Sequence, residues 1–247
     1  MKQIERIEVL GDSILKGIQV NPENKRYYTK NDIDLNKLSD MYSLTFTNDS
    51  RFGCTVTKGS QLISKQLEKG KVFDAIVMDF GGNDCDYKWE EIAANPGGEF
   101  KPNTPLDLFI TEYTKLIKTI KNNHMIPILT TLPPLDPQRF FDWWCGNLNK
   151  ENVMKWLGSI KTIYNHQAMY SSCVEEIAKQ ENVPLIDIRS AFLKKDHVEG
   201  LICEDGTHPN SNGQKIISEA FQEFFQKYLK QNSLLQPDPS LNTCLPA

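Results

Sequence analysis

Short apolar runs alternate along the chain with longer segments whose apolar residues recur at helical spacing. The runs are short and rich in β-branched residues, which is typical of strands that are buried on both faces. Five strands are predicted, at residues 4–10, 44–48, 73–80, 125–132 and 183–188. Four helices are predicted from the longer segments, at residues 57–67, 106–122, 164–180 and 210–229.

This alternation predicts an α/β fold in which helices cover both faces of a parallel sheet. Ligands of such sheets bind at the carboxyl ends of the strands, so candidate chemistry is sought there. Two stretches interrupt the alternation. Residues 86–105 are polar, and residues 136–158 are aromatic, with Trp143 and Trp144 at their centre. The aromatic stretch is either a lid or wall over a binding site or ordinary packing.

Length and composition favour one soluble domain. The 247 residues carry 39% hydrophobic and 24% charged side chains, which is ordinary for a globular chain. We expect a single domain at residues 1–230, followed by a loosely attached tail at residues 231–247, which contain three prolines. A net charge of −4 provides no basic surface for nucleic acid. No apolar run approaches the ~20 residues that insert into a membrane, and the charged N-terminus lacks a signal-peptide pattern, so a cytoplasmic location is expected.

The first strand ends in Gly11-Asp12-Ser13, and helix-like sequence follows. A serine at such a turn is held with its hydroxyl pointing outward, while nearby backbone N–H groups can face a developing oxyanion. Ser13 is therefore a candidate nucleophile. The alternative is that Asp12 or Ser13 serves only as the N-cap of a helix.

Two further strand ends carry possible oxyanion donors. Gly53 follows the second strand, and a glycine there lets the backbone N–H approach a ligand closely. Asn83 lies in the sequence Gly-Gly-Asn-Asp at the end of the third strand, where its side chain can donate a neutral hydrogen bond. The alternatives are an ordinary turn glycine and a glycine-rich turn with Asx capping.

A candidate base lies close to the last predicted helix. Asp205 and His208 are three positions apart in a tight loop, so the carboxylate can reach Nδ1 of the imidazole and leave Nε2 free to accept a proton. The alternative is a solvated loop in which Asn210 caps the helix. The other three histidines lack an acid so placed, and we predict them at the surface: His124, His166 and His197.

Together these sites resemble the SGNH hydrolase superfamily, the GDSL esterases and lipases. The match runs over residues 11–213, and no catalytic position departs from the pattern. The matching positions are Gly11, Asp12, Ser13 and Gly17 in the first block, Asn48 and Gly53 in the second, Gly81, Gly82, Asn83 and Asp84 in the third, and Asp205 and His208 in the last. The resemblance implies a three-layer α/β/α, flavodoxin-like fold with a five-stranded parallel sheet. It also implies an oxyanion hole made by the Ser13 and Gly53 N–H groups and the Asn83 side chain.

The function implied is that of a serine esterase with Ser13, His208 and Asp205 as its triad. It would form an acyl-enzyme from a small or short-chain acyl ester, such as an acetylated carbohydrate. An acyltransferase, a lysophospholipase or a thioesterase could use the same site. A non-catalytic flavodoxin-like binding module is a further alternative, although the chain has neither a dinucleotide fingerprint nor a P-loop. The oligomeric state is left open.

No cofactor or metal is expected. Six cysteines are present without a C-x-x-C pair, and free thiols are the default for a cytosolic chain of this size. Cys54, Cys85 and Cys203 lie next to predicted site residues in the sequence. We interpret them as small apolar wall residues rather than as a metal or redox site.

Overall fold

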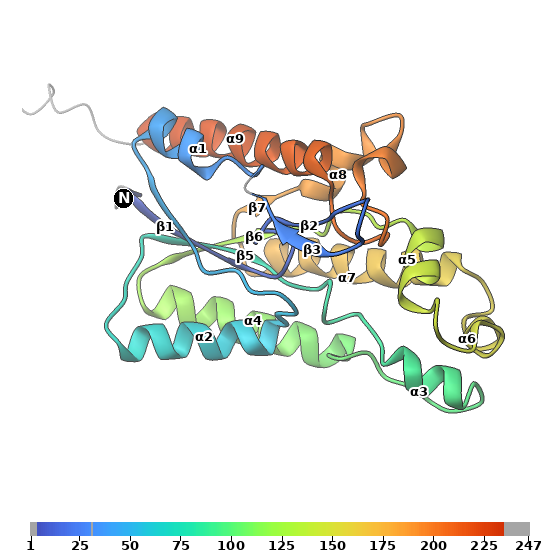
Figure 1. Ribbon diagram of the computed structural model, residues 1–247. Helices are drawn as coiled ribbons and strands as arrows, with labels where there is room; N and C mark the ends of the chain where they lie inside the picture. The colour runs from blue at the N-terminus through green and yellow to red at the C-terminus, as the bar shows by residue number, and fades with distance from the viewer. Residues whose placement is uncertain (1–3, 31, 235–247) are drawn as a thin grey trace, which may run out of the picture.

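The computed structural model describes residues 4–30 and 32–234, and a five-stranded parallel sheet forms its centre (Figure 1). The strands, in spatial order, are β4 (Thr45–Asn48), β1 (Arg6–Gly11), β5 (Ala75–Asp79), β6 (Ile126–Thr130) and β7 (Leu185–Ile186). Every neighbouring pair is parallel. Each predicted strand contains or overlaps one of these, so the predicted three-layer α/β/α class is confirmed.

Helices cover both faces of the sheet, with α1 and α9 on one side and α2 and α4 on the other (Figure 1). Alternate side chains of β5 point to opposite faces of the sheet. Ala75 and Val77 pack into one apolar cluster, and Ile76 and Met78 pack into the other. The first cluster is completed by α1 (Leu35–Tyr42), α8 (Ile188–Leu193) and α9 (Ser211–Leu234). The second is completed by α2 (Val56–Glu68), α4 (Leu106–Asn122) and α7 (Lys161–Gln180).

Helix α4 shows how the sequence pattern builds these layers. Pro105 precedes the helix, where its missing N–H costs no hydrogen bond, and Asp107 places a negative charge in the first turn. Apolar residues then recur every three or four positions on one face, so that all of them are buried against the sheet. They are Phe109, Tyr113, Leu116, Ile117 and Ile120.

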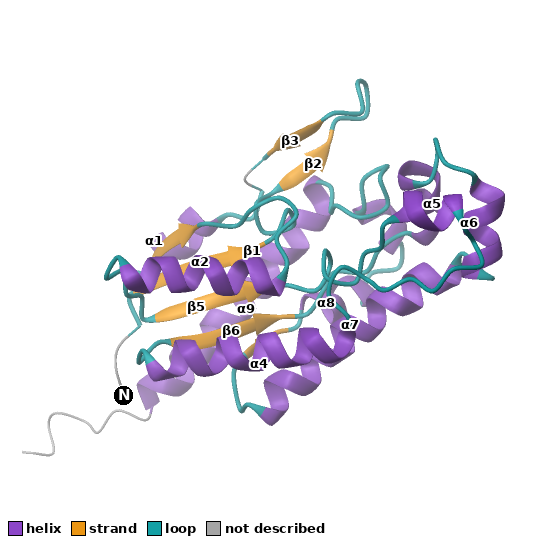
Figure 2. Cartoon of the chain, turned by 90° about the horizontal axis from the view of Figure 1, so that it is seen from below, coloured by secondary structure: helices purple, strands orange, loops and turns teal. Residues whose placement is uncertain are grey.

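The two interrupting stretches fold into a small helical unit at the carboxyl end of the sheet (Figures 1 and 2). We call it the cap, and it consists of α3 (Trp89–Ala94), α5 (Pro137–Trp144) and α6 (Lys150–Leu157). Its apolar side chains form a third cluster, separate from the two sheet layers. An antiparallel hairpin of β2 (Ile18–Val20) and β3 (Tyr27–Thr29) also projects from this end (Figure 2).

The last helix, α9, reaches Leu234, four residues into the segment expected to be a loosely attached tail. Residues 235–247, the rest of that segment, lie outside the described residues, so the division at residue 230 stays a prediction. Within the described part of the chain, no helix is long and apolar enough to cross a membrane.

The contrast between two neighbours on α4 tests the assignment of its buried face. Phe109 is fully buried, whereas Leu108 is 45% exposed. Phe109→Ala is expected to lower the free energy of unfolding by about 3–5 kcal/mol, because it removes apolar contacts and leaves a cavity. Leu108→Ala should change it by less than about 0.5 kcal/mol. Urea denaturation of both variants measures the difference, and equal effects would contradict the assignment.

Candidate active site

The strand order brings the sequence-predicted residues together. Ser13 follows β1, Gly53 follows β4 and Asn83 follows β5. Because β1 pairs with β4 on one side and β5 on the other, Ser13 emerges between the other two. Asp205 and His208 reach the same edge from the loop before α9.

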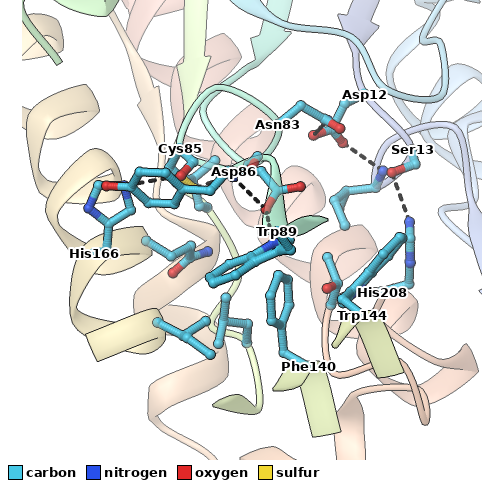
Figure 3. Close-up of a pocket in the computed structure, with 18 of the residues that line it drawn as sticks. Asp12, Ser13, Asn83, Cys85, Asp86, Trp89, Phe140, Trp144, His166 and His208 are labelled. Carbon is cyan, nitrogen blue, oxygen red and sulfur yellow. Dashed lines mark hydrogen bonds between the residues drawn. The ribbon is translucent and has the colours of Figure 1, made fainter. Parts of the chain in front are cut away.

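Ser13, His208 and Asp205 form one hydrogen-bonded chain. The Ser13 Oγ lies 2.8 Å from His208 Nε2 (Figure 3). On the other side of the ring, His208 Nδ1 lies 2.5 Å from Asp205 Oδ2. All three side chains are buried. An imidazole held in this way has one nitrogen engaged by a carboxylate and the other facing a hydroxyl, so it can remove the hydroxyl proton.

The surroundings of Asp205 favour its ionised form. Burial alone raises the pKa of this carboxyl group, but the hydrogen bond and charge of His208 and the backbone N–H groups of Thr207 and His208 lower it more. The pKa of Asp205 therefore lies below its ordinary value. Both N–H groups donate to Oδ1 at 3.1 Å, which leaves Oδ2 for the imidazole.

Gly206 ties this loop to the cap. Its φ is +74°, a backbone conformation that favours glycine, and a Cβ there would lie 2.2 Å from the Phe140 backbone nitrogen. The Asp136 N–H donates to the Gly206 carbonyl at 2.8 Å. The chain segment that positions His208 is thus packed directly against α5.

The three candidate oxyanion donors follow the ends of three adjacent strands, β1, β4 and β5. Gly53 has a φ of +68°, which other residues adopt only with strain. Among the described residues, the Ser13 and Gly53 N–H groups have no hydrogen-bond acceptor. Asn83 Nδ2 donates one bond, of 2.7 Å, to Asp12 Oδ2. Because an amide nitrogen carries two hydrogens, Asn83 keeps a second donor.

Three carboxyl groups at or just after the ends of β1 and β5 are buried. Asp84 accepts from the Val56 N–H at the start of α2, and its burial raises its pKa to about 6. Burial also raises the pKa of Asp79 to about 7, although Thr130 Oγ1 donates to it at 2.9 Å. Burial and the neighbouring Asp79 raise the pKa of Asp12 well above its ordinary value. These carboxyl groups therefore bind protons more readily than exposed ones.

A cavity of about 140 Å³ opens from Ser13 towards the cap (Figure 3). Its walls are mostly aromatic and aliphatic. The aromatic stretch predicted as a lid, a wall or ordinary packing contributes Phe140, Trp144 and Trp156 to them. The other large apolar side chains are Ile14, Phe52, Tyr87, Trp89, Leu132, Leu135, Leu157 and Ile163.

His166 corrects one prediction. It was expected at the surface, but it lines the cavity opposite Ser13 and His208 (Figure 3), with Nε2 3.0 Å from the Cys85 carbonyl. Burial lowers its pKa. The missed signal was helical spacing, since His166 lies one turn before the buried Tyr170. The other two predicted surface histidines, His124 and His197, are exposed.

Two aromatic rings that the sequence reasoning missed flank His208. The Tyr27 ring lies edge-on at a centroid distance of 5.3 Å, and the Phe52 ring is stacked at 6.0 Å. Tyr27 comes from the β2–β3 hairpin, whose three-residue strands are too short to show a hydrophobic period. These rings help to keep the imidazole only 2% exposed.

Some of the three cysteines near predicted site residues were expected to line the pocket, and Cys85 does; Cys54 and Cys203 are buried and do not line this cavity. The five cysteines within the described residues are free thiols, and Cys244 lies outside that part. Burial raises the pKa of both Cys54 and Cys203 to about 11. These two thiols are therefore protonated near neutral pH, as suits apolar packing.

Known proteins resemble this chain in sequence and in fold. A family model described as GDSL-like Lipase/Acylhydrolase matches residues 7–221. The isoamyl acetate-hydrolyzing esterase of Saccharomyces cerevisiae is 26% identical over 136 residues, which cover 53% of each protein. The chain spans about half the length of the curated relatives it matches.

Solved structures share the fold over most of the chain. A lipase/acylhydrolase from Enterococcus faecalis superimposes with a TM-score of 0.63 at 17% identity, covering 91% of this chain and 97% of that one. A catalytic mutant of Axe2, an acetylxylan esterase from Geobacillus stearothermophilus, gives a TM-score of 0.60 at 18% identity, with 89% and 93% covered.

The buried Asp79 predicts a pH dependence of stability. Its pKa rises from an ordinary 3.8 to about 7 on folding, so the folded chain binds an extra proton between these values. The associated stability is fully present below about pH 4 and is lost as the pH rises through 7. The free energy of unfolding of the wild type should therefore fall between about pH 5 and 8. In Asp79→Asn this fall should be smaller by on the order of 2 kcal/mol, because the asparagine does not titrate. Urea denaturation at both pH values measures this loss, and an unchanged loss in the variant would refute it.

Proposed function

The chain belongs to the GDSL-like lipase/acylhydrolase family of ester-hydrolysing serine hydrolases, and we propose that it acts through a triad of Ser13, His208 and Asp205. The observation that carries this proposal is the buried chain of two hydrogen bonds, 2.8 Å and 2.5 Å long, that links the three side chains at the end of an apolar cavity. A hydroxyl, a base and an acid that orients the base are the parts that acyl transfer needs.

In the first half-reaction, Ser13 Oγ attacks the ester carbonyl carbon while His208 Nε2 takes the hydroxyl proton. Asp205 stabilises the resulting imidazolium. The tetrahedral intermediate then breaks its bond to the alcohol oxygen, which leaves with the proton from Nε2. In the second half-reaction, a water molecule gives a proton to Nε2 and attacks the acyl-enzyme, and the acid departs as Ser13 regains its proton.

We assign oxyanion stabilisation to the Ser13 and Gly53 N–H groups and to Asn83 Nδ2. Donors that are already oriented cost no reorganisation when the negative charge develops. The bond from Asn83 to Asp12 supports this role, because it orients the amide and leaves one hydrogen for the substrate oxygen. Asn103 adds a second restraint by donating to the Asn83 carbonyl at 3.0 Å.

The proposed substrate is a small or short-chain acyl ester, such as an acetylated carbohydrate. The modest cavity of about 140 Å³ supports a small group. The names of two similar proteins point the same way, since one acts on isoamyl acetate and the other is an acetylxylan esterase, and both substrates are acetate esters.

Removal of the nucleophile provides the first test. Ser13→Ala should lower kcat for p-nitrophenyl acetate by up to about 10⁶-fold, because no group remains to form the acyl-enzyme. Ser50→Ala is a matched control: Ser50 is also buried, and its hydroxyl has no partner among the described residues. The control should keep nearly full activity. Turnover by Ser13→Ala at a rate close to that of the control would exclude Ser13 as the nucleophile.

Asn83→Ala tests the oxyanion assignment separately. Loss of one oxyanion donor should reduce kcat by about 10²–10³-fold, whereas KM should change little, because the negative charge develops only in the transition state. Steady-state kinetics with the same ester separate the two constants. Asn122→Ala, on the exposed side of α4, serves as the control. A normal kcat for Asn83→Ala would remove the side chain from the oxyanion hole.

A further inference from the structure

One side chain in the cavity plays no part in the proposed mechanism. Asp86 lines the cavity, and its Oδ1 accepts from Trp89 Nε1 at 2.8 Å and from the Tyr87 N–H at 2.9 Å. Both of these bonds go to Oδ1, and no described residue donates to the other oxygen, Oδ2. The side chain is half-buried, so Oδ2 remains accessible to a ligand or to water in a cavity whose walls are mostly apolar.

The two residues that donate to this carboxyl group, Tyr87 and Trp89, pack their rings with that of Trp156. The Tyr87 ring lies 5.9 Å from that of Trp89 and 5.0 Å from that of Trp156, and the two tryptophan rings are 6.3 Å apart. All three rings line the cavity. The faces of such rings carry negative charge density and attract cations, most strongly when the cation is removed from water. We call these three residues and Asp86 the aromatic subsite.

The protein supplies no positive charge to this subsite. No lysine or arginine of the described chain lines the cavity. The buried Arg189 points elsewhere: it donates to Gln167 Oε1 at 2.8 Å and lies over the Tyr164 ring. His166, across the cavity, is directed at the Cys85 carbonyl, and burial lowers its pKa, so it is neutral at pH 7.5.

The charge of Asp86 itself persists at that pH. Burial raises its pKa to about 6, and the bonds from Trp89 and Tyr87 oppose the rise, so the carboxyl group is mostly ionised at pH 7.5. The other acidic group that lines the cavity, Asp12, lies beside the oxyanion donors and has its Oδ2 bonded to Asn83. The cavity thus combines aromatic walls with an anion that no neighbouring cation balances.

We propose that the aromatic subsite binds a positively charged alkyl group of the substrate, a substituted or quaternary ammonium. The ester that the triad hydrolyses would then carry such a group in its acyl or alcohol part. This inference rests on the proposed function for the hydrolysis step, but binding at the subsite does not require Ser13.

Choline and 3,3-dimethylbutan-1-ol test the proposal, because they have nearly the same shape and differ in charge. Trp89, Trp144 and Trp156 line the cavity, so intrinsic tryptophan fluorescence reports occupancy. At pH 7.5 the wild type should bind choline at least about 10-fold more tightly than the neutral alcohol. Equal affinity, or no detectable choline binding, would overturn the proposal.

Asp86→Asn separates charge recognition from a purely structural role. The amide oxygen can still accept the bonds from Trp89 and Tyr87, so the wall is retained while the charge is removed. The choline preference should fall below about 3-fold, with little change in affinity for the alcohol. Glu90→Gln removes an exposed charge from α3 outside the cavity and should keep the preference. A preference that persists in Asp86→Asn would contradict the assignment.

Turnover distinguishes this inference from the proposed function. Acetylcholine and 3,3-dimethylbutyl acetate form the corresponding pair of esters, and each would yield acetate and its alcohol. Hydrolysis of both at equal kcat/KM, abolished by Ser13→Ala, would uphold the triad and reject the charged subsite. A choline preference in binding without hydrolysis of any ester would uphold the subsite and reject the triad.

Discussion

The site depends on one constraint, the pairing of β1 with β4 and β5 in a parallel sheet. Parallel strands end at the same edge, so the residues that follow three adjacent strands meet without any long connection. Ser13 leaves the central strand of the three, with Gly53 and Asn83 on its two sides. The hydrogen bond from the Arg51 N–H to the Gly11 carbonyl, 2.9 Å long, continues the β1–β4 pairing into the loop that carries Gly53.

The second part of the site depends on packing between the cap and the loop before α9. Asp205 and His208 are only three positions apart in the sequence, but the loop that holds them is fixed by contact with α5 at Gly206 and by the hydrogen bond from Cys203 N–H to the His208 carbonyl. The same cap provides most of the aromatic cavity wall. The elements that orient the proposed base and those that would select the substrate are therefore mechanically connected.

The sequence predicted the sheet and the site residues for the same reason. Residues 75–78 are apolar at every position because this strand is buried on both faces, and glycine and polar residues mark where each strand ends. A local motif was enough for Asp205 and His208, because the contact spans only three residues. The hairpin that carries Tyr27 and the position of His166 depend on tertiary packing, which leaves little trace in the local pattern.

The cap illustrates the same limit. Its composition predicted that residues 136–158 were unusual, but the packing of this stretch against residues 86–105 joins segments that are distant in sequence. The environment of Asp86 likewise depends on how its side chain is oriented in the folded chain. A polar loop sequence does not reveal that Trp89 and Tyr87 both donate to Oδ1 of this side chain. Nor does it reveal that Oδ2 receives no hydrogen bond from the described residues.

The central claim is that Ser13 forms the covalent intermediate. Its most direct test is to treat the wild-type protein with an activated phosphonate ester, digest it and identify the modified peptide by mass spectrometry. We expect one addition per chain, on Ser13, with loss of esterase activity in proportion to labelling. Labelling of a different side chain in parallel with the loss of activity, or full inactivation without any label on Ser13, would contradict it.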